Sequence, residues 1–488
     1  MNKNEVSDFI SAQKISGFFL FLSQLSSIFL IPLITKNYSQ ELLAEFILIT
    51  GSISLFVSFV TGGIGYTYMK EYSNSSNKAK KGFLFYSQFF MSLAIIIIAS
   101  IITYGIGFFA SIVNQNFLWV VEFSVLLAFL LSTLFISKLL EFYRFEKESL
   151  IYSVYNFIYS FFPFIAILLY FTLGEKINIE SMLIVISCLN FILILIVSRQ
   201  VLTRIPVVFS FPTTRIIKND IKYGIKWKFS NLLEAFFQYI DKLIIGVFLS
   251  TGTLGAYVVS ITVGSAMILL PKIVNIFLLP FVLVDRDVNE SNDLKITTIS
   301  SNLFLLFAIP YIFGVFVIGE DVIELFSTHE IAIEAGYLAY LFSIGAIFYG
   351  LYINIKPIFI KNNQTHDLFS SRIFSLFVLI VMLILGIYYE SLLVISIGVV
   401  ISNIVGYVYL LNKTKNVTLD FTCIKKYMIS SFVMLIALVF FKSVFQLHDI
   451  DFTVFYLLLI GLLTYFTSLV ILNNGWNGKI VGLLVRSD

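Results

Sequence analysis

The feature that most constrains this chain is a succession of long apolar runs separated by short polar connections. A run of about 17 to 25 apolar residues is the length that crosses the hydrocarbon core of a bilayer as an α-helix. Hydrophobic residues make up 59% of the 488 residues and charged residues only 12%, whereas soluble domains contain about 45–50% and 25%. No connection is long enough to form a soluble domain of ordinary composition. The sequence therefore predicts an all-α, polytopic membrane protein.

Fourteen runs of spanning length can be counted along the chain. The first is not followed by a small-residue cleavage site, so we expect a membrane helix there and not a cleaved signal peptide. The eighth run is overlong and is interrupted by Pro271 and Pro280. The expected spans cover roughly residues 16–35, 46–67, 82–106, 117–137, 152–173, 181–198, 229–250, 253–284, 299–318, 335–355, 373–389, 392–411, 427–441 and 452–472.

The positions of the lysine and arginine residues predict the orientation of these spans. Cytoplasmic connections collect such residues. All but four of the 32 fall on the termini and on every second connection. The exceptions are Lys36, Lys176 and Lys442, on the opposite connections, and Lys242, inside an apolar run. We therefore expect both termini to face the cytoplasm.

The spacing of the runs suggests an internal repeat. A shift of about 212 residues lays spans one to six on spans seven to twelve. Because six is even, the two halves would share one orientation, as parallel repeats do, and such halves commonly enclose a substrate path at their interface. We expect four parts: an N-lobe of six spans at 1–198, a cytoplasmic linker with seven basic residues at 199–228, a C-lobe of six spans at 229–411, and two further spans with a cytoplasmic C-terminus at 412–488.

The seventh run carries the most unusual residues of the chain. Glu234, Gln238, Asp241 and Lys242 interrupt an otherwise apolar segment. Glu234 and Asp241 are seven residues apart, so they lie ~10 Å apart on one face of a helix. Ionisable groups in a membrane are costly and face protein or water. We favour the wall of a polar cavity, with a carboxylate that takes up protons or cations. The alternative is a static interhelical pair of Asp241 and Lys242.

Two further residues are candidates for the same cavity. Gln24 lies among serines in the first run, which the repeat places opposite the seventh. Small polar residues also pack membrane helices together, so a packing role is the competing interpretation. Lys272 follows Pro271, where a bend could direct its ammonium group toward an anionic head group. It could equally extend to the cytoplasmic surface.

Residues for covalent or metal chemistry are scattered along the chain. The three histidines, His329, His366 and His448, fall in different connections, and the two cysteines have no partner at metal-ligand spacing. The sequence "GWNGK" at 475–479 is too short between its glycines for a phosphate-binding loop. We therefore expect no catalytic residue, no metal site, no cofactor and no nucleic-acid partner, and the protein is not predicted to be an enzyme.

The segment "DKLIIGVFLSTGTLGAYVVS", which begins at Asp241, together with spans arranged as six, six and two, resembles a known family. The pattern is similar to the Wzx-type O-antigen flippases of the multidrug/oligosaccharidyl-lipid/polysaccharide exporter superfamily. Asp241, Gly246, Gly255 and Tyr257 carry the local match. The architectural resemblance extends over the whole chain. Within its apolar runs, however, this sequence contains more acidic than basic residues.

The resemblance implies movement of an undecaprenyl-diphosphate-linked oligosaccharide, such as an O-antigen unit of lipopolysaccharide, across the bacterial cytoplasmic (inner) membrane. It also implies basic cavity residues for the diphosphate, a coupling proton or sodium ion, contact with membrane lipid, and the polysaccharide polymerase machinery as a partner. One alternative is a drug or cation antiporter of the MATE type, for which Glu234 and Asp241 would be cation ligands. Another is a membrane polymerase or glycosyltransferase, although no large loop bears catalytic residues.

Overall fold

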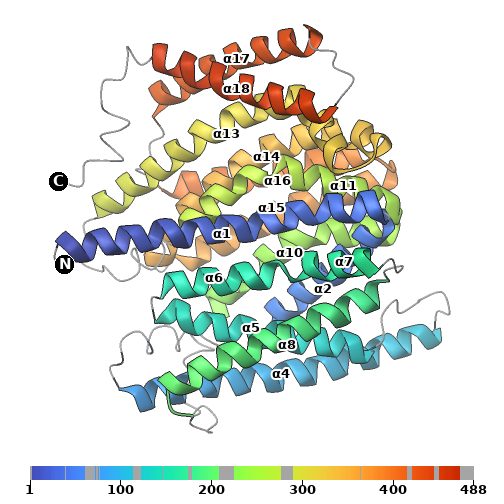
Figure 1. Ribbon diagram of the computed structural model, residues 1–488, viewed down its shortest axis with the longest axis vertical. Coiled ribbons are helices and arrows are strands. Elements are labelled where there is room, and N and C mark those ends of the chain that lie inside the picture. The colour runs from blue at the N-terminus through green and yellow to red at the C-terminus, as the bar shows by residue number, and fades with distance from the viewer. Residues whose placement is uncertain are drawn as a thin grey trace. The chain divides into compact units, whose positions relative to one another are not determined.

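The computed structural model describes residues 3–38, 40–60, 72, 75, 77–113, 123–146, 148–173, 178–207, 225–275, 290–362, 364–414, 420–444 and 450–472. All regular elements within these ranges are helices (Figure 1). They are α1 (Lys3–Asn37), α2 (Gln40–Val60), α4 (Lys78–Val113), α5 (Phe123–Phe145), α6 (Ser149–Ser160), α7 (Phe162–Leu173), α8 (Ile179–Arg204), α10 (Ile225–Phe248), α11 (Thr251–Gly264), the 3₁₀ turn η2 (Ala266–Ile268), α13 (Glu290–Phe326), α14 (His329–Lys361), α15 (Thr365–Tyr388), α16 (Leu392–Lys413), α17 (Phe421–Val444) and α18 (Ile450–Leu472).

These helices are long and apolar enough for a multi-pass membrane protein. Among the described residues, 10 helical segments meet the length and composition of a span, or 11 with the bent pair Gly252–Gly264 and Ala266–Asn275. Many of their apolar side chains, such as Leu195, Phe377 and Ile436, are exposed, as a lipid-facing surface requires. The predicted all-helical membrane fold is confirmed. The predicted number of fourteen spans stays a prediction.

Helix α8 illustrates how the local sequence sets the bounds of a span. Asn178 precedes its first turn, and the Asn178 side chain accepts a hydrogen bond of 2.8 Å from the backbone N–H of Ser181. The Ser181 hydroxyl in turn accepts from the backbone N–H of Asn178, which completes a capping box. The helix then continues through an apolar stretch to Arg204 in its last turn, where a basic residue suits the negative end of the helix dipole.

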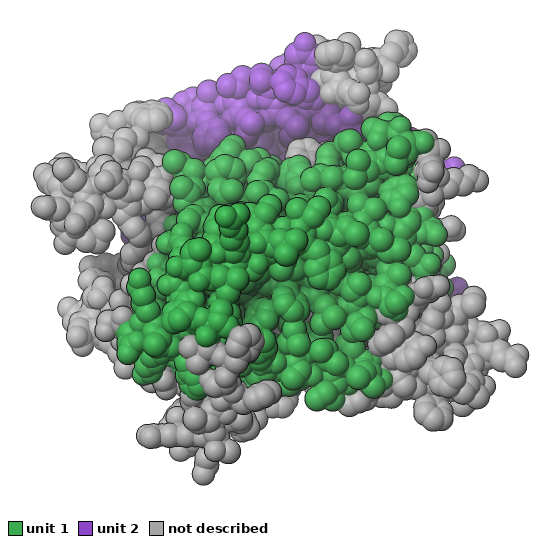
Figure 2. Space-filling view, turned by 60° about the horizontal axis from the view of Figure 1, so that its bottom comes forward, with its two compact units in different colours: residues 1–254, 368–373 green, residues 255–367, 374–488 purple. Residues whose placement is uncertain are grey.

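The chain divides into two compact units (Figure 2). Unit 1 comprises Met1–Leu254 and Leu368–Ile373, and unit 2 comprises Gly255–Asp367 and Phe374–Asp488. Within unit 1, α1 packs on α6, α5 on α8 and α2 on α10. Within unit 2, α13 packs on α14 and on α17, α14 on α16, and α17 on α18. The four predicted parts stay a prediction, and most of the expected linker, 208–224, lies outside the described residues.

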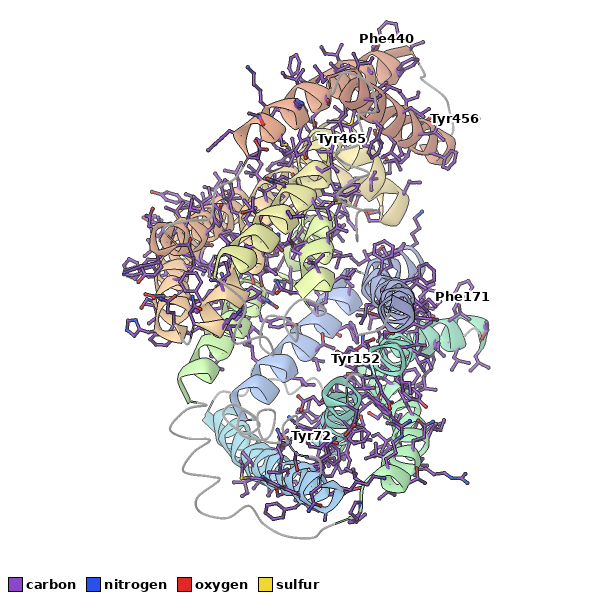
Figure 3. The ribbon with its side chains drawn as sticks, turned by 90° about the vertical axis from the view of Figure 1, so that its left-hand side faces the viewer. Tyr72, Tyr152, Phe171, Phe440, Tyr456 and Tyr465 are labelled. Atoms are coloured by element: carbon purple, nitrogen blue, oxygen red, sulfur yellow. The ribbon has the colours of Figure 1, made fainter. Side chains whose placement is uncertain are left out.

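Two prolines inside helices of unit 2, Pro310 and Pro357, are matched by side-chain donors from other segments. Pro310 in α13 has no N–H to donate to the carbonyl of Leu306, four residues earlier, and the Tyr465 hydroxyl of α18 donates to that carbonyl at 2.7 Å (Figure 3). Pro357 in α14 likewise frees the carbonyl of Ile353, and the Asn275 amide donates to it at 2.6 Å. Each freed carbonyl therefore becomes a point of attachment between helices, which a membrane interior without water requires.

The eighth predicted span is bent in the structure. The pair Gly252–Gly264 and Ala266–Asn275 turns by 51°, and the break lies at Ser265, six residues before Pro271. The hydroxyl of Tyr311 donates to the carbonyl of Val263 at this break. A Cβ on Gly264 would lie 2.4 Å from the carbonyl oxygen of Ala339. The bend thus depends on a close approach to α14 that only glycine permits.

Candidate functional site

The charged stripe of the seventh predicted span, which comprises Glu234, Gln238, Asp241 and Lys242, lies on helix α10. Glu234, Phe237 and Asp241 are buried, whereas Val247 and Phe248 at its end are exposed. The buried residues follow a spacing of three and four, so they share one face of the helix. Two glycines bring α10 and α2 close together. A Cβ on Gly246 would lie 2.8 Å from a methyl group of Leu48, and one on Gly51 would lie 2.9 Å from the ring of Tyr239.

The carboxylate of Glu234 is bound by a guanidinium group from α15. Nε of Arg372 donates to Oε2 at 2.8 Å, and Nη2 donates to Oε1 at 2.7 Å. The guanidinium carbon of Arg372 lies over the ring of Phe237, 4.8 Å from the ring centroid. The side chain of Arg372 is 1% exposed and that of Glu234 is 11% exposed. Both residues belong to unit 1. The arrangement is a bidentate, aromatic-supported ion pair sealed from solvent in this conformation.

Arg372 is a site residue that the sequence pattern did not single out. It immediately precedes the apolar run that begins at residue 373, so its charge falls among the basic residues of the connection before that run. The helix, however, begins at Thr365, so Arg372 lies two turns inside it, ~10 Å from its start. The polar stretch from Thr365 to Ser371 contains no proline or glycine that would stop a helix. The absence of a helix-breaking residue before the apolar run was therefore the one sign in the sequence that the helix begins early and includes Arg372.

Asp241 and Lys242 form a second pair, contained within α10. The Lys242 ammonium donates to Oδ1 of Asp241 at 3.2 Å and to the backbone carbonyl of Gln238 at 2.7 Å. It also lies 5.9 Å from the ring centroid of Tyr239. Asp241 is buried and Lys242 is partly buried. This contact joins neighbouring residues of one helix, and the choice between a cavity wall and a static pair stays open. The assignment of these residues to a substrate or ion cavity stays a prediction.

The two remaining sequence candidates, Gln24 and Lys272, belong to other helical segments. The side chain of Gln24 lies outside the described residues. Its neighbours Ser23 and Ser26 join α1 to α6, because Ser23 accepts a hydrogen bond of 3.1 Å from the Asn156 amide and Ser26 donates one of 3.0 Å to the carbonyl of Ser160. Lys272 belongs to unit 2, unlike the α10 residues. The structure therefore brings Glu234, Gln238, Asp241 and Lys242 together on α10 and adds Arg372.

The residues of this cluster can bind an ion of opposite charge in place of their present partners. Within the described ranges, no group of three or more His, Cys, Asp or Glu side chains is placed to hold a metal ion. Each of the two buried carboxylates of α10 instead lies against a basic group. An anion that approached Arg372, or a cation that approached Glu234, would have to replace the present partner.

Comparison with solved structures identifies the class of fold. The lipid II flippase MurJ in an inward closed conformation aligns with a TM-score of 0.72 at 18% identity, covering 95% of this chain and 99% of that chain. A MATE structure in the straight conformation aligns with a TM-score of 0.60 at 12% identity, covering 86% and 96%. A point mutant of the Vibrio cholerae MATE transporter VcmN gives 0.60 at 14% identity, covering 85% and 98%. The fold is therefore the one that MurJ and the MATE transporters share.

The sequence places the chain more narrowly within that class. It belongs to the polysaccharide biosynthesis protein family, whose profile matches residues 20–330. A comparison with curated proteins finds no match. The matched range includes α10 and ends within α14, so the family signal covers Glu234 and Asp241 but stops before Arg372.

Proposed function

We propose that this protein is a flippase for a lipid-linked oligosaccharide. Its substrate is an undecaprenyl-diphosphate-linked repeat unit of a surface polysaccharide, and it carries that unit from the inner to the outer leaflet of a bacterial cytoplasmic membrane. Both chain termini then face the cytoplasm, in line with the distribution of lysine and arginine. The observation that carries the proposal is the buried Glu234–Arg372 pair in a member of the polysaccharide biosynthesis family.

The proposal accounts for charges inside apolar helices. A diphosphate and its sugars lose their hydrogen bonds to water on entering hydrocarbon, and the cost is prohibitive unless protein groups replace those bonds. A guanidinium and several carboxylate, amide and ammonium groups on α10 and α15 supply such replacements. The polyprenyl tail stays in the bilayer while the site opens to each side in turn. No bond is made or broken, so the function needs no catalytic residue.

The MATE-type antiporter is the main alternative, because MATE structures share the fold. In that function Glu234 and Asp241 would bind the drug or coupling cation directly. Both carboxylates already lie within hydrogen-bonding distance of a basic group. A cation would have to displace Arg372 or Lys242, just as an anion would have to displace Glu234, so the match to the polysaccharide biosynthesis family is what makes the antiporter the weaker proposal. A polymerase or glycosyltransferase is the weakest of the three proposals. Such an enzyme would need catalytic residues, and the sequence predicts no large loop that bears them.

Deletion of the gene in a strain without a second copy tests the proposed function. We expect surface polysaccharide to disappear while lipid-linked units accumulate on the cytoplasmic side, and the wild-type gene to restore display. Sugar-specific lectin labelling of intact cells and extraction of the lipid-linked pool measure both effects. Normal surface polymer in the deletion strain would refute the proposal. A change in polymer length alone would favour the polymerase.

A further inference from the structure

The Glu234–Arg372 pair has the geometry of an occupied anion site. The guanidinium offers two parallel N–H groups, and the carboxylate fills them with two oxygens at 2.8 and 2.7 Å. A phosphate presents two oxygens in the same arrangement, which is why arginine binds both groups in a bidentate manner. Phe237 covers one face of the guanidinium and helps to fix its plane. A phosphate that reached this position would find its donors already aligned.

We propose that Arg372 is the diphosphate-binding residue of this protein and that Glu234 is a placeholder that occupies it while no substrate is bound. This inference rests on the proposed function. Arg372 is 1% exposed, so the substrate reaches it only after the site opens. The carboxylate neutralises the guanidinium in the empty protein, and the incoming diphosphate takes the place of the carboxylate.

The exchange explains why the partner of Arg372 is an acid. A guanidinium buried without a counter-charge would be very costly, so an empty site needs a substitute anion. Glu234 supplies one from the same unit.

A second ion pair in unit 1 provides a matched comparison. Nη1 of Arg204 lies 2.6 Å from Oε1 of Glu148, and their side chains are 37% and 34% exposed. The residue types are the same as in the Glu234–Arg372 pair, but solvent reaches both partners. An exposed pair of this kind contributes little and is readily screened. Variants of Glu148 therefore control for the loss of a carboxylate from an arginine.

Binding of farnesyl diphosphate to the full-length protein in lipid nanodiscs tests the inference, with farnesol as the uncharged reference. We expect Glu234→Gln to bind farnesyl diphosphate at least about tenfold more tightly than wild type, because the competing carboxylate is gone. Arg372→Lys should bind at least about tenfold more weakly, since it loses the bidentate contact. Glu148→Gln should match wild type.

A variant that keeps the charge covers the case in which Glu234→Gln does not fold. Glu234→Asp shortens the reach of the carboxylate, so it should also bind farnesyl diphosphate more tightly than wild type. Equal or weaker binding by the variant that folds would overturn the placeholder and leave Glu234 a structural partner. If wild type instead binds farnesyl diphosphate no better than farnesol and the deletion strain displays normal polymer, the proposed function fails as well. Intact transport together with unchanged binding in the variants would reject the placeholder alone.

Discussion

Arg372 and Glu234 are two opposite charges that are buried together. Each group alone would be unstable where it lies, but together they satisfy two hydrogen bonds and cancel their charges. Such a pair contributes less to stability than its geometry suggests, because both groups lost their hydration. Its more informative property is the large cost of removing one partner. That asymmetry makes the pair suitable for exchange of one anion for another.

The cost of removing one partner leads to the first prediction. Arg372→Met should destabilise the protein by about 3–5 kcal/mol, because it leaves the buried Glu234 carboxylate without its counter-charge. The double variant Arg372→Met, Glu234→Gln should recover most of that loss. Midpoints of thermal unfolding in detergent measure the effect, with Glu148→Gln as the half-exposed control. Additive losses in the double variant would show that the two residues do not act as a pair.

Glu146, just after α5, gives a prediction for pH. Burial raises the pKa of this carboxyl, but hydrogen bonds from the Tyr72 hydroxyl at 2.6 Å and the Lys81 ammonium at 2.9 Å outweigh it, so the pKa lies below its ordinary value of 4.5. A carboxyl with a lowered folded-state pKa stabilises the fold above its unfolded-state pKa and loses this contribution as the pH falls through the folded value. Wild type should therefore be more heat-stable than Glu146→Gln at neutral pH and lose that advantage below pH 4.5. A difference that is independent of pH would contradict this.

Only part of the cluster around Glu234 could be predicted from the sequence. The stripe on α10 could be predicted, because four polar residues in one apolar run are visible without any partner. The partner could not, because Arg372 lies 138 positions away from Glu234 and its own helix begins earlier than the apolar run suggests. Hydropathy finds where a span is apolar, whereas the helix extends as far as its backbone hydrogen bonds do. Charged residues in the first turns of a span are therefore easily assigned to loops.

Among the helices of unit 2, a proline in one helix repeatedly provides the attachment point for another. Leu306 in α13 and Ile353 in α14 have carbonyls freed by Pro310 and Pro357, and both accept from side chains of other segments. The last two helices are attached in part this way, since Tyr465 of α18 binds α13, and the Lys442 ammonium of α17 contacts Asp321 of α13 at 2.6 Å. The prolines could be located in the sequence, but the donors that match them could not.

The coupling between Pro310 and Tyr465 can be measured directly. Tyr465→Phe should cost about 1 kcal/mol or more, because the carbonyl of Leu306 is then buried without a donor. In a Pro310→Ala background the backbone N–H of residue 310 can satisfy that carbonyl, so the same change at Tyr465 should cost much less. Thermal unfolding of the four proteins of this cycle gives the coupling. An equal effect of Tyr465→Phe in both backgrounds would show that the hydroxyl does not serve the freed carbonyl.

For the whole molecule, the succession of apolar runs was sufficient to predict the class of fold. Long runs such as those that became α8, α13 and α16 correspond closely to single helices, because membrane hydrocarbon leaves the backbone no other regular choice than helix or closed barrel. The bend after Gly264 could not be located, since it depends on packing against Ala339 in α14. The chain belongs to the polysaccharide biosynthesis protein family and has the fold of MurJ, and both support the proposed transport of a lipid-linked oligosaccharide.

Reconstitution of the purified protein into liposomes tests the central claim most directly. The liposomes contain a polyprenyl-diphosphate-linked oligosaccharide with a fluorescent sugar, and a membrane-impermeant quencher reports how much of it is exposed outside. With wild-type protein, the protected inner pool should become accessible to the quencher much faster than in protein-free liposomes, and Arg372→Lys should slow this exchange. Access at the protein-free rate, with folded and correctly inserted protein, would contradict the account.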